Sequence, residues 1–261
     1  MKNYYLKYVI KAYYSKHKIQ ITGRLQVDIE KGNHKVLTHI SYAIRNLSAI
    51  SGINDLLQEI ANVNVQGFEG ERIYQNRLTE LFGIKFVHKI LRMKIIEAES
   101  KSIKILSPNR KRKDASCDIR AKNGNRDYYF ETKDESSKST TSAIKNGVTH
   151  FEPKDDDEIV EWVKNMCRKA SNKGANYLIC RVPVWLNSLR ESFPSDWVKR
   201  VFKTELKGKD VAFNIENIDS FFEGVYIVKP GRYITNPRNG WFRLVVKKDI
   251  VKALDSGSGP E

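Results

Sequence analysis

The chain has 261 residues and a formal net charge of +15, from 46 Lys and Arg against 31 Asp and Glu. Such an excess favours polyanionic partners: DNA, RNA or an anionic membrane. No apolar run approaches the roughly 18 residues of a transmembrane helix, and no signal-peptide pattern opens the chain. Nucleic acid is therefore the expected partner, no membrane partner is expected, and the expected location is the cytoplasm.

The three cysteines, Cys117, Cys167 and Cys180, are odd in number, widely spaced and without any CxxC pair. This spacing argues against a disulfide framework or a structural zinc site and is typical of a reducing compartment.

Residues 1–66 are expected to form a mainly helical region, because apolar and aromatic residues recur there at helical spacing. The first run contains Tyr5, Tyr8, Val9, Ala12 and Tyr13. An aromatic stripe of this kind could stack on nucleic-acid bases, but it is more often part of a core. We favour the core interpretation and keep the other open.

Residues 67–83 predict a helix between two glycines. Glu71 lies on its apolar stripe with Leu78 and Phe82. A buried glutamate without a partner is costly, so Glu71 is expected to contact a cation or a hydrogen-bond donor. The alternative is a first-turn acid that favours the helix dipole. Glu80 lies off the stripe and is expected to be solvated.

The secondary structure of residues 84–106 is ambiguous from the sequence, and residues 109–113 are strongly basic. Residues 84–90 and 102–106 are the best strand candidates. The run NRKRK at 109–113 could hold phosphate groups through its cations, or could be a solvated loop. The expected nucleic-acid-binding residues are Arg110, Lys111, Arg112, Lys113 and, in the polar loop 134–155, Lys138.

Residues 114–135 carry the main functional signal, because they predict a hairpin around Asn123-Gly124. Strand side chains alternate with period two. A loop of two or four residues therefore places Asp118 and Glu131 on one face, and Lys133 shares that face. A three-residue loop without a bulge would separate the two carboxylates.

Two carboxylates and a lysine suit a divalent metal and a water to be activated. Mg²⁺ takes one or two carboxylates together with waters and phosphate oxygens. The metal lowers the pKa of a bound water and offsets charge on the scissile phosphate, and a neighbouring lysine can stabilise that charge. We expect Mg²⁺ as the cofactor, with Mn²⁺ able to replace it. The alternative is an exposed hairpin with ordinary surface charges.

The C-terminal part predicts further helices and strands. Helices are expected at 156–172 and 195–207, and strands at 176–184, 221–228 and 241–248. The tail 255–261 is expected to be disordered.

Helix, strand, a hairpin with Asp and then Glu-x-Lys, helix, strand: this order resembles the core of the PD-(D/E)xK nuclease superfamily, which includes many type II restriction endonucleases. The resemblance covers about residues 67–184. It implies that Asp118, Glu131 and Glu71 bind the metal and that Lys133 is the catalytic lysine. The proline that usually precedes the Asp is absent, and Cys117 stands in its place.

The resemblance implies an α/β fold with a central mixed sheet flanked by helices. It divides the chain into a helical region (1–66), a nuclease core (67–184), C-terminal additions (185–254) and the tail. The implied function is that of a Mg²⁺-dependent DNA endonuclease of restriction or genome-defence type. The implied substrate is double-stranded DNA, and a homodimer is a possible assembly. Two alternatives stay open: a non-catalytic nucleic-acid-binding module, and a nuclease subunit of a defence, repair or transposition assembly.

Overall fold

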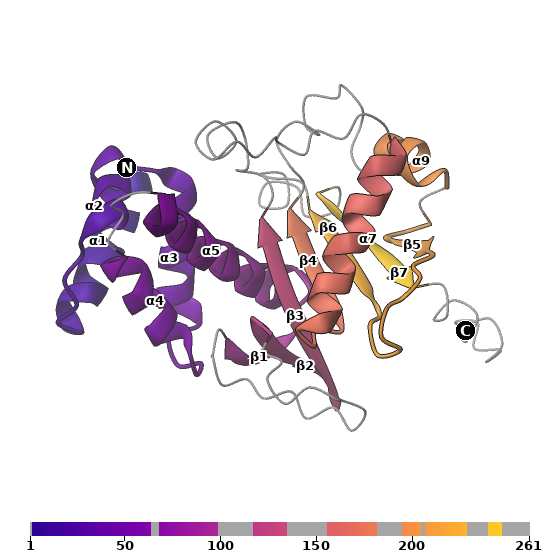
Figure 1. Cartoon of the computed structure of the whole chain (residues 1–261). Helices are drawn as coiled ribbons and strands as arrows, with labels where there is room; N and C mark the ends of the chain where they lie inside the picture. Colours follow the sequence, from indigo (N-terminus) through magenta and orange to yellow (C-terminus); the bar gives the residue numbers. More distant parts are fainter. Residues whose placement is uncertain are drawn as a thin grey trace. The chain divides into compact units, whose positions relative to one another are not determined.

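The computed structural model describes residues 2–63, 68–98, 117–134, 156–181, 195–204, 207–228 and 240–246. These residues form an α/β structure with a seven-stranded sheet (Figure 1). Contacts divide the chain into two compact units. The first comprises Met1–Lys104 and Asp118–Tyr128, and the second Ile105–Cys117 and Tyr129–Glu261. The division into four regions expected from the sequence stays a prediction.

Four helices open the first unit, as the helical periodicity of residues 1–66 predicts. They are α1 (Lys2–Lys16), α2 (Gly23–Lys31), α3 (His34–Asn46) and α4 (Ile53–Asn62). The helix α1 packs on α3, and α2 packs on α4. Their facing stripes bury side chains completely, among them Ile10, Leu25, Leu37, Ile40 and Leu57. The helical prediction is confirmed for the described residues.

One carboxylate is buried in this helical core and has several hydrogen-bond donors. Asp28 is 4% exposed. Its Oδ2 accepts a hydrogen bond from the Tyr74 hydroxyl at 2.8 Å, and its Oδ1 accepts one from the Asn33 side chain at 2.8 Å. Arg24 adds an ion pair at 3.7 Å. These partners offset the cost of removing the charge from water.

The helix predicted at 67–83 is α5 (Phe68–Lys85), which continues directly into a π-helical turn, η1 (Phe86–Ile90). The strand predicted at 84–90 is therefore wrong. Short apolar runs do not distinguish a strand from a buried helix by periodicity alone. Here Ile84, Phe86 and Val87 are all fully buried in helical geometry.

The predicted hairpin is present, with its turn displaced by one residue. Its strands are β2 (Ile119–Asn123) and β3 (Arg126–Asp134). The turn residues are Gly124 and Asn125, not Asn123 and Gly124. Gly124 has a φ of +57°, whereas Asn125 is not among the residues with positive φ. This pattern is typical of a type II′ turn, which places glycine at its first central position.

The remaining strands complete a mixed sheet. They are β1 (Lys94–Ala98), β4 (Tyr177–Arg181), β5 (Asp210–Phe213), β6 (Gly224–Val228) and β7 (Trp241–Val246). The order is β1-β2-β3-β4-β6-β7-β5. The strand β4 runs parallel to β3 and β6, whereas β6 and β7 are antiparallel. A mixed sheet was predicted and is confirmed; β1 and β5 were not predicted.

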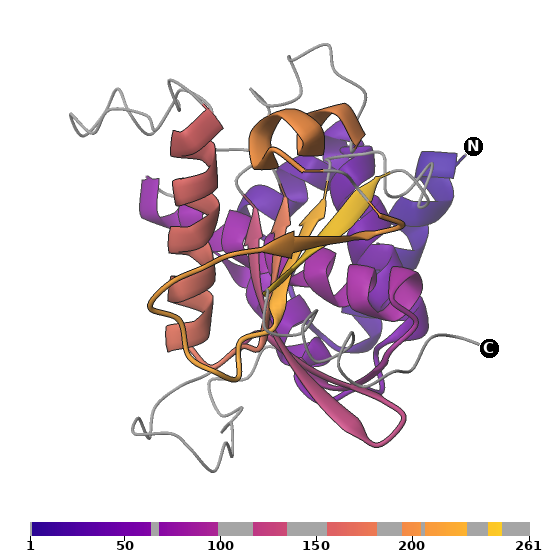
Figure 2. The ribbon, with the colours of Figure 1, turned by 90° about the vertical axis from the view of Figure 1, so that its right-hand side faces the viewer.

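Two helices of the second unit match their predictions at 156–172 and 195–207. These are α7 (Asp156–Asn172) and the shorter α9 (Ser195–Phe202). The helix α7 joins the parallel neighbours β3 and β4, packs against β4 and α9, and covers one face of these strands (Figures 1 and 2). Parallel strands need such a crossover connection. It brings the C-terminal end of α7 back to the start of β4.

Gly224, the first residue of β6, allows the close approach of β6 to β7. A Cβ built there would lie 2.2 Å from the Leu244 carbonyl oxygen. Because that oxygen belongs to the backbone, it can yield only if the strand moves.

We therefore expect Gly224→Ala to lower the free energy of unfolding by about 1–3 kcal/mol, measured by urea denaturation. Gly124→Asn is the matched control. No atom lies within 4 Å of a Cβ at Gly124, so any cost of this change comes from the positive φ of residue 124 and not from a steric clash. A Gly224→Ala variant as stable as the wild type would show that β6 and β7 lie further apart.

Candidate functional site

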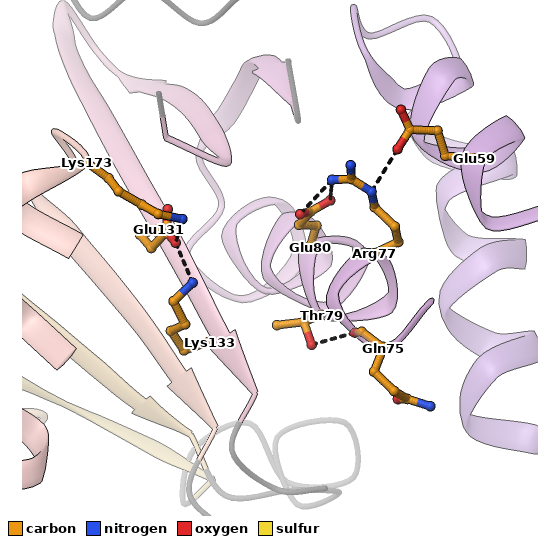
Figure 3. A network of polar contacts seen from close by, with 8 residues as sticks. All are labelled: Glu59, Gln75, Arg77, Thr79, Glu80, Glu131, Lys133 and Lys173. Carbon is orange, nitrogen blue, oxygen red and sulfur yellow. Dashed lines mark hydrogen bonds and ion pairs between the residues drawn. The ribbon is translucent and has the colours of Figure 1, made fainter. Parts of the chain in front are cut away.

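The most unusual polar group of the second unit is the carboxylate of Glu131 on β3. Its side chain is 0% exposed. The Oε1 atom accepts a hydrogen bond from Lys133 Nζ at 2.6 Å and another from Lys173 Nζ at 2.5 Å (Figure 3). We call these three residues the Glu131 cluster. It places a buried negative charge between two positive charges.

The strand geometry explains the pair formed by Glu131 and Lys133. Residues two apart on a strand point to the same face. Glu131 lies in the interior of the sheet, opposite Leu178 of the parallel strand β4. The Lys133 side chain is longer and remains 34% exposed. Its stem can thus follow the sheet while its ammonium group contacts both the carboxylate and water.

Lys173 reaches Glu131 from the turn that follows α7. Its backbone N–H donates to the Ala170 carbonyl at 3.1 Å, and the chain then reverses at Gly174, which has a φ of +91°. Two hydrogen bonds fasten this turn to β3. The Asn176 N–H donates to the Tyr129 carbonyl at 2.9 Å, and the Tyr129 N–H donates to Asn176 Oδ1 at 2.7 Å.

Lys173 was not predicted from the sequence. The available signal was a lysine at a helix C-terminus next to a glycine, which is common at helix ends. Only the β3–α7–β4 connection brings it to Glu131, and that proximity could not be derived from spacing along the chain.

The other predicted acidic residues belong to the first unit. Asp118 is half-buried and directly precedes β2. Glu71 is half-buried on α5, and its Oε1 accepts a hydrogen bond from Gln75 Nε2 at 2.9 Å. Glu71 thus has the hydrogen-bond donor that its position on the stripe predicts.

The prediction of a solvated Glu80 is wrong. Glu80 is 8% exposed, and both its oxygens accept hydrogen bonds from Arg77 Nη1 at 3.0 Å (Figure 3). Arg77 also forms an ion pair with Glu59 of α4 at 2.7 Å. The helix α5 contacts α3, α4 and β2, so its buried surface is wider than the single stripe assumed from the sequence.

The predicted phosphate-binding residues lie outside the described residues. They are Arg110, Lys111, Arg112, Lys113 and Lys138. The strand predicted at 102–106 and the tail 255–261 also lie there.

Within the described ranges, no group of three or more His, Cys, Asp and Glu residues could hold a metal ion. The three cysteines are buried and form no disulfide bond with one another. Burial raises the pKa of the Cys167 thiol, which keeps it in the protonated form that binds metals poorly. None of the described helices has the length and apolar character needed to cross a membrane.

A second polar group was not predicted and lies in the first unit, where α5 enters η1. Lys85 is 3% exposed, and its Nζ lies 5.2 Å from the centre of the Tyr42 ring. The Tyr42 hydroxyl is hydrogen-bonded to His88 Nδ1 at 2.7 Å. Burial, with a smaller effect from Lys89, lowers the pKa of Lys85 to about 8.

Comparisons with protein-family models, with curated proteins and with solved structures found no match to this chain. The site is therefore interpreted from its own geometry and chemistry.

The Glu131 cluster predicts that its two lysines share one stabilising role. Lys173→Met should lower the free energy of unfolding by about 1–2 kcal/mol. This cost lies between that of losing an exposed ion pair and that of breaking a fully buried one, because Glu131 is buried and Lys173 is half exposed. The double variant with Lys133→Met should cost more than the sum of the two single changes, because it leaves Glu131 without either cation. Urea denaturation measures all three.

Lys122→Met is the control, since Lys122 lies 3.9 Å from the partly exposed Asp127 on the same hairpin. It should cost less than about 1 kcal/mol. Strictly additive costs for Lys133 and Lys173 would argue against shared compensation of Glu131.

Lys85 predicts a distinct pH dependence. Its pKa is lowered from 10.5 to about 8, so the unfolded chain binds more protons than the folded chain between these values. The contribution of Lys85 to the free energy of unfolding therefore becomes more favourable as the pH rises through that window. Lys85→Met should be more stable than the wild type at pH 7, and this advantage should shrink by about 1–3 kcal/mol by pH 10. Lys94→Met, a change at an exposed lysine of β1, is the control and should keep the wild-type profile in urea denaturation. A constant advantage of Lys85→Met would contradict the lowered pKa.

Proposed function

We propose that the chain is a metal-dependent nuclease that hydrolyses phosphodiester bonds in DNA. The observation that carries the proposal is the Glu131 cluster. A carboxylate with no exposed surface lies two residues before a lysine on an interior strand, and that lysine donates to it at 2.6 Å. A structural role alone does not require so costly an arrangement, because an apolar pair of similar volume is often as stable.

In this proposal Asp118 and Glu131 supply the metal-binding oxygens and Lys133 stabilises charge on the scissile phosphate. The turn at Gly124 and Asn125 supports it, because a two-residue turn has the even length that the arrangement requires. Lys133 is partly exposed, which suits a residue that contacts a substrate. An ammonium group beside the reacting phosphate can also orient the attacking water.

The donor chemistry fits a hard divalent cation. Mg²⁺ takes one or two carboxylates and completes its shell with waters and phosphate oxygens, so it needs no group of three protein ligands. Bound there, it would supply an activated water and offset negative charge. Glu131 already needs positive charge around it, which Lys133 and Lys173 provide.

Two side chains of α5, Glu71 and Glu80, are candidates for a third metal-binding carboxylate. The resemblance to the nuclease superfamily implies Glu71, whereas Glu80 is the more buried of the two. Glu80 is held by Arg77 at 3.0 Å through both oxygens, and Glu71 by the neutral amide of Gln75. A carboxylate held by a neutral donor is freer to bind a cation, and this favours Glu71.

The second candidate function is a non-catalytic module that binds nucleic acid. Two ammonium groups lie within 2.6 Å of Glu131 Oε1, so the carboxylate is stable without a metal. The net charge of +15 suits phosphate binding in either case.

Supercoiled, linear and single-stranded DNA incubated with the protein in Mg²⁺ or Mn²⁺ should distinguish the two functions. We expect cleavage that EDTA abolishes. Asp118→Asn, Glu131→Gln and Lys133→Met should each reduce it about 100-fold or more. Glu71→Gln should raise the Mg²⁺ concentration needed for half-maximal cleavage, and Glu80→Gln should not.

Asp127→Asn is the matched control, since Asp127 is an acidic residue on the same hairpin, paired with Arg120 at 3.4 Å. It should retain wild-type cleavage. DNA binding that weakens with salt, without cleavage of any substrate, would reject the nuclease and support the binding module. Cleavage at the wild-type rate by the Asp118, Glu131 and Lys133 variants would reject the assignment of the site.

A further inference from the structure

The N-terminal part of α1 carries exposed aromatic side chains that are not packed in the core of the first unit. Tyr4, Tyr5 and Tyr8 are 82%, 53% and 67% exposed. Among the described residues, the only other exposed large hydrophobic side chain is Ile73, at 38%. Tyrosine bodies are largely apolar and are normally covered at least in part. Three of them bare within five residues therefore indicate an interaction surface.

The same helix shows what a tyrosine does when it belongs to the core. Tyr13 and Tyr14, one to two turns further on, are 9% and 1% exposed. Their hydroxyls donate to Asn54 Oδ1 at 2.6 Å and to the Leu57 carbonyl at 2.7 Å. The aromatic run of α1 thus has a core part and an exposed part. The preference for core packing holds for the former, and Tyr5 and Tyr8 of the predicted core run are corrected here.

The charged residues of α1 all have one sign. The helix α1 contains Lys2, Lys7, Lys11 and Lys16 and no acidic residue. Arg45 of α3 adds a guanidinium group 5.8 Å from the centre of the Tyr5 ring. A cation at that distance from a ring face is attracted to it. A partner that offers both π surfaces and negative charge would match these rings and cations.

The spacing joins these two requirements. Tyr4, Tyr8 and Lys11 follow one another at i, i+4 and i+7, which places them on one stripe. Successive members are separated by about 6 Å and about 4.5 Å along the helix axis. Two rings and a cation in a row suit neighbouring nucleotides, with bases on the rings and a phosphate on the lysine.

We propose that Tyr4, Tyr5, Tyr8 and Lys11 form a binding site for unpaired nucleotides of a single-stranded nucleic acid. Bases in a duplex are stacked on one another, so exposed rings can reach only unpaired ones. The apolar face of α1 is already buried on the first unit, with Ile10 and Tyr14 at 0% and 1% exposure. A membrane-bound amphipathic helix would need that wide apolar face for lipid. The inference does not depend on the nuclease activity.

Fluorescence anisotropy of labelled 15-nucleotide strands with the full chain in EDTA tests this site without any cleavage. Tyr4→Ala with Tyr8→Ala should weaken binding of oligo-dT about 25-fold or more, from at least about fivefold per ring. Oligo-rU in parallel shows whether RNA bases stack as well, and loss with either strand supports the site. Lys11→Ala should flatten the log–log salt dependence by about one unit.

Tyr4→Phe with Tyr8→Phe is the matched control. It keeps both rings and should keep wild-type affinity, and Ile73→Ala controls for the loss of any exposed apolar side chain. Because the changed rings are exposed, the melting temperature should not move. Unchanged affinity of the alanine variant for both strands would overturn the proposal. An equal loss on a duplex would also overturn it, by showing general polyanion contact, as would a loss confined to anionic phosphatidylserine vesicles.

Discussion

A buried negative charge, the carboxylate of Glu131, constrains the strands and the turn around it in the second unit. Moving the Glu131 carboxylate out of water costs several kcal/mol unless cations and donors compensate it. Its compensation comes from two places in the chain: its own strand, and the turn between α7 and β4. The position of that turn is therefore tied to β3 by electrostatics as well as by the backbone hydrogen bonds of Asn176.

The strands around Glu131 explain why the charge can be held so firmly. The strand β4 lies between β3 and β6, in register with both, and all five residues of β6 are buried. Since successive strand residues point to opposite faces, the five buried residues show that the sheet is covered on both faces at β6. The lysines, in contrast, end at the surface. The Glu131 carboxylate is thus fully buried, whereas the side chains of its two cations are 34% and 50% exposed.

Much of this architecture was predictable, because long periodic segments define helices well. The helices α5 and α7 and the strands β4, β6 and β7 follow directly from apolar spacing. The run from Ile84 to Val87 was mispredicted because all four residues, Lys85 included, are buried, so polarity does not mark an exposed face from which a period could be read. The strand β5 is only four residues long, which gives too few alternations to recognise.

The candidate site was likewise predictable only in part. Glu131 and Lys133 were found because their relation is local, two positions on one strand. Lys173 was missed because its relation to Glu131 spans 42 residues and depends on where a crossover helix ends. Glu80 was misplaced because burial depends on how many neighbours surround a helix, which periodicity does not count.

The short strand β5 has a consequence for how the protein behaves in concentrated solution. Among the described strands it ends the sheet beyond β7, and its residues alternate between exposed and buried. The Arg243 guanidinium contacts Asp210 at 2.7 Å and 3.0 Å at its first residue, and Lys209 precedes it. A brief strand bordered by charges is a poor template for a strand of another molecule. This end of the sheet is thereby protected against the edge-to-edge pairing through which β-proteins aggregate.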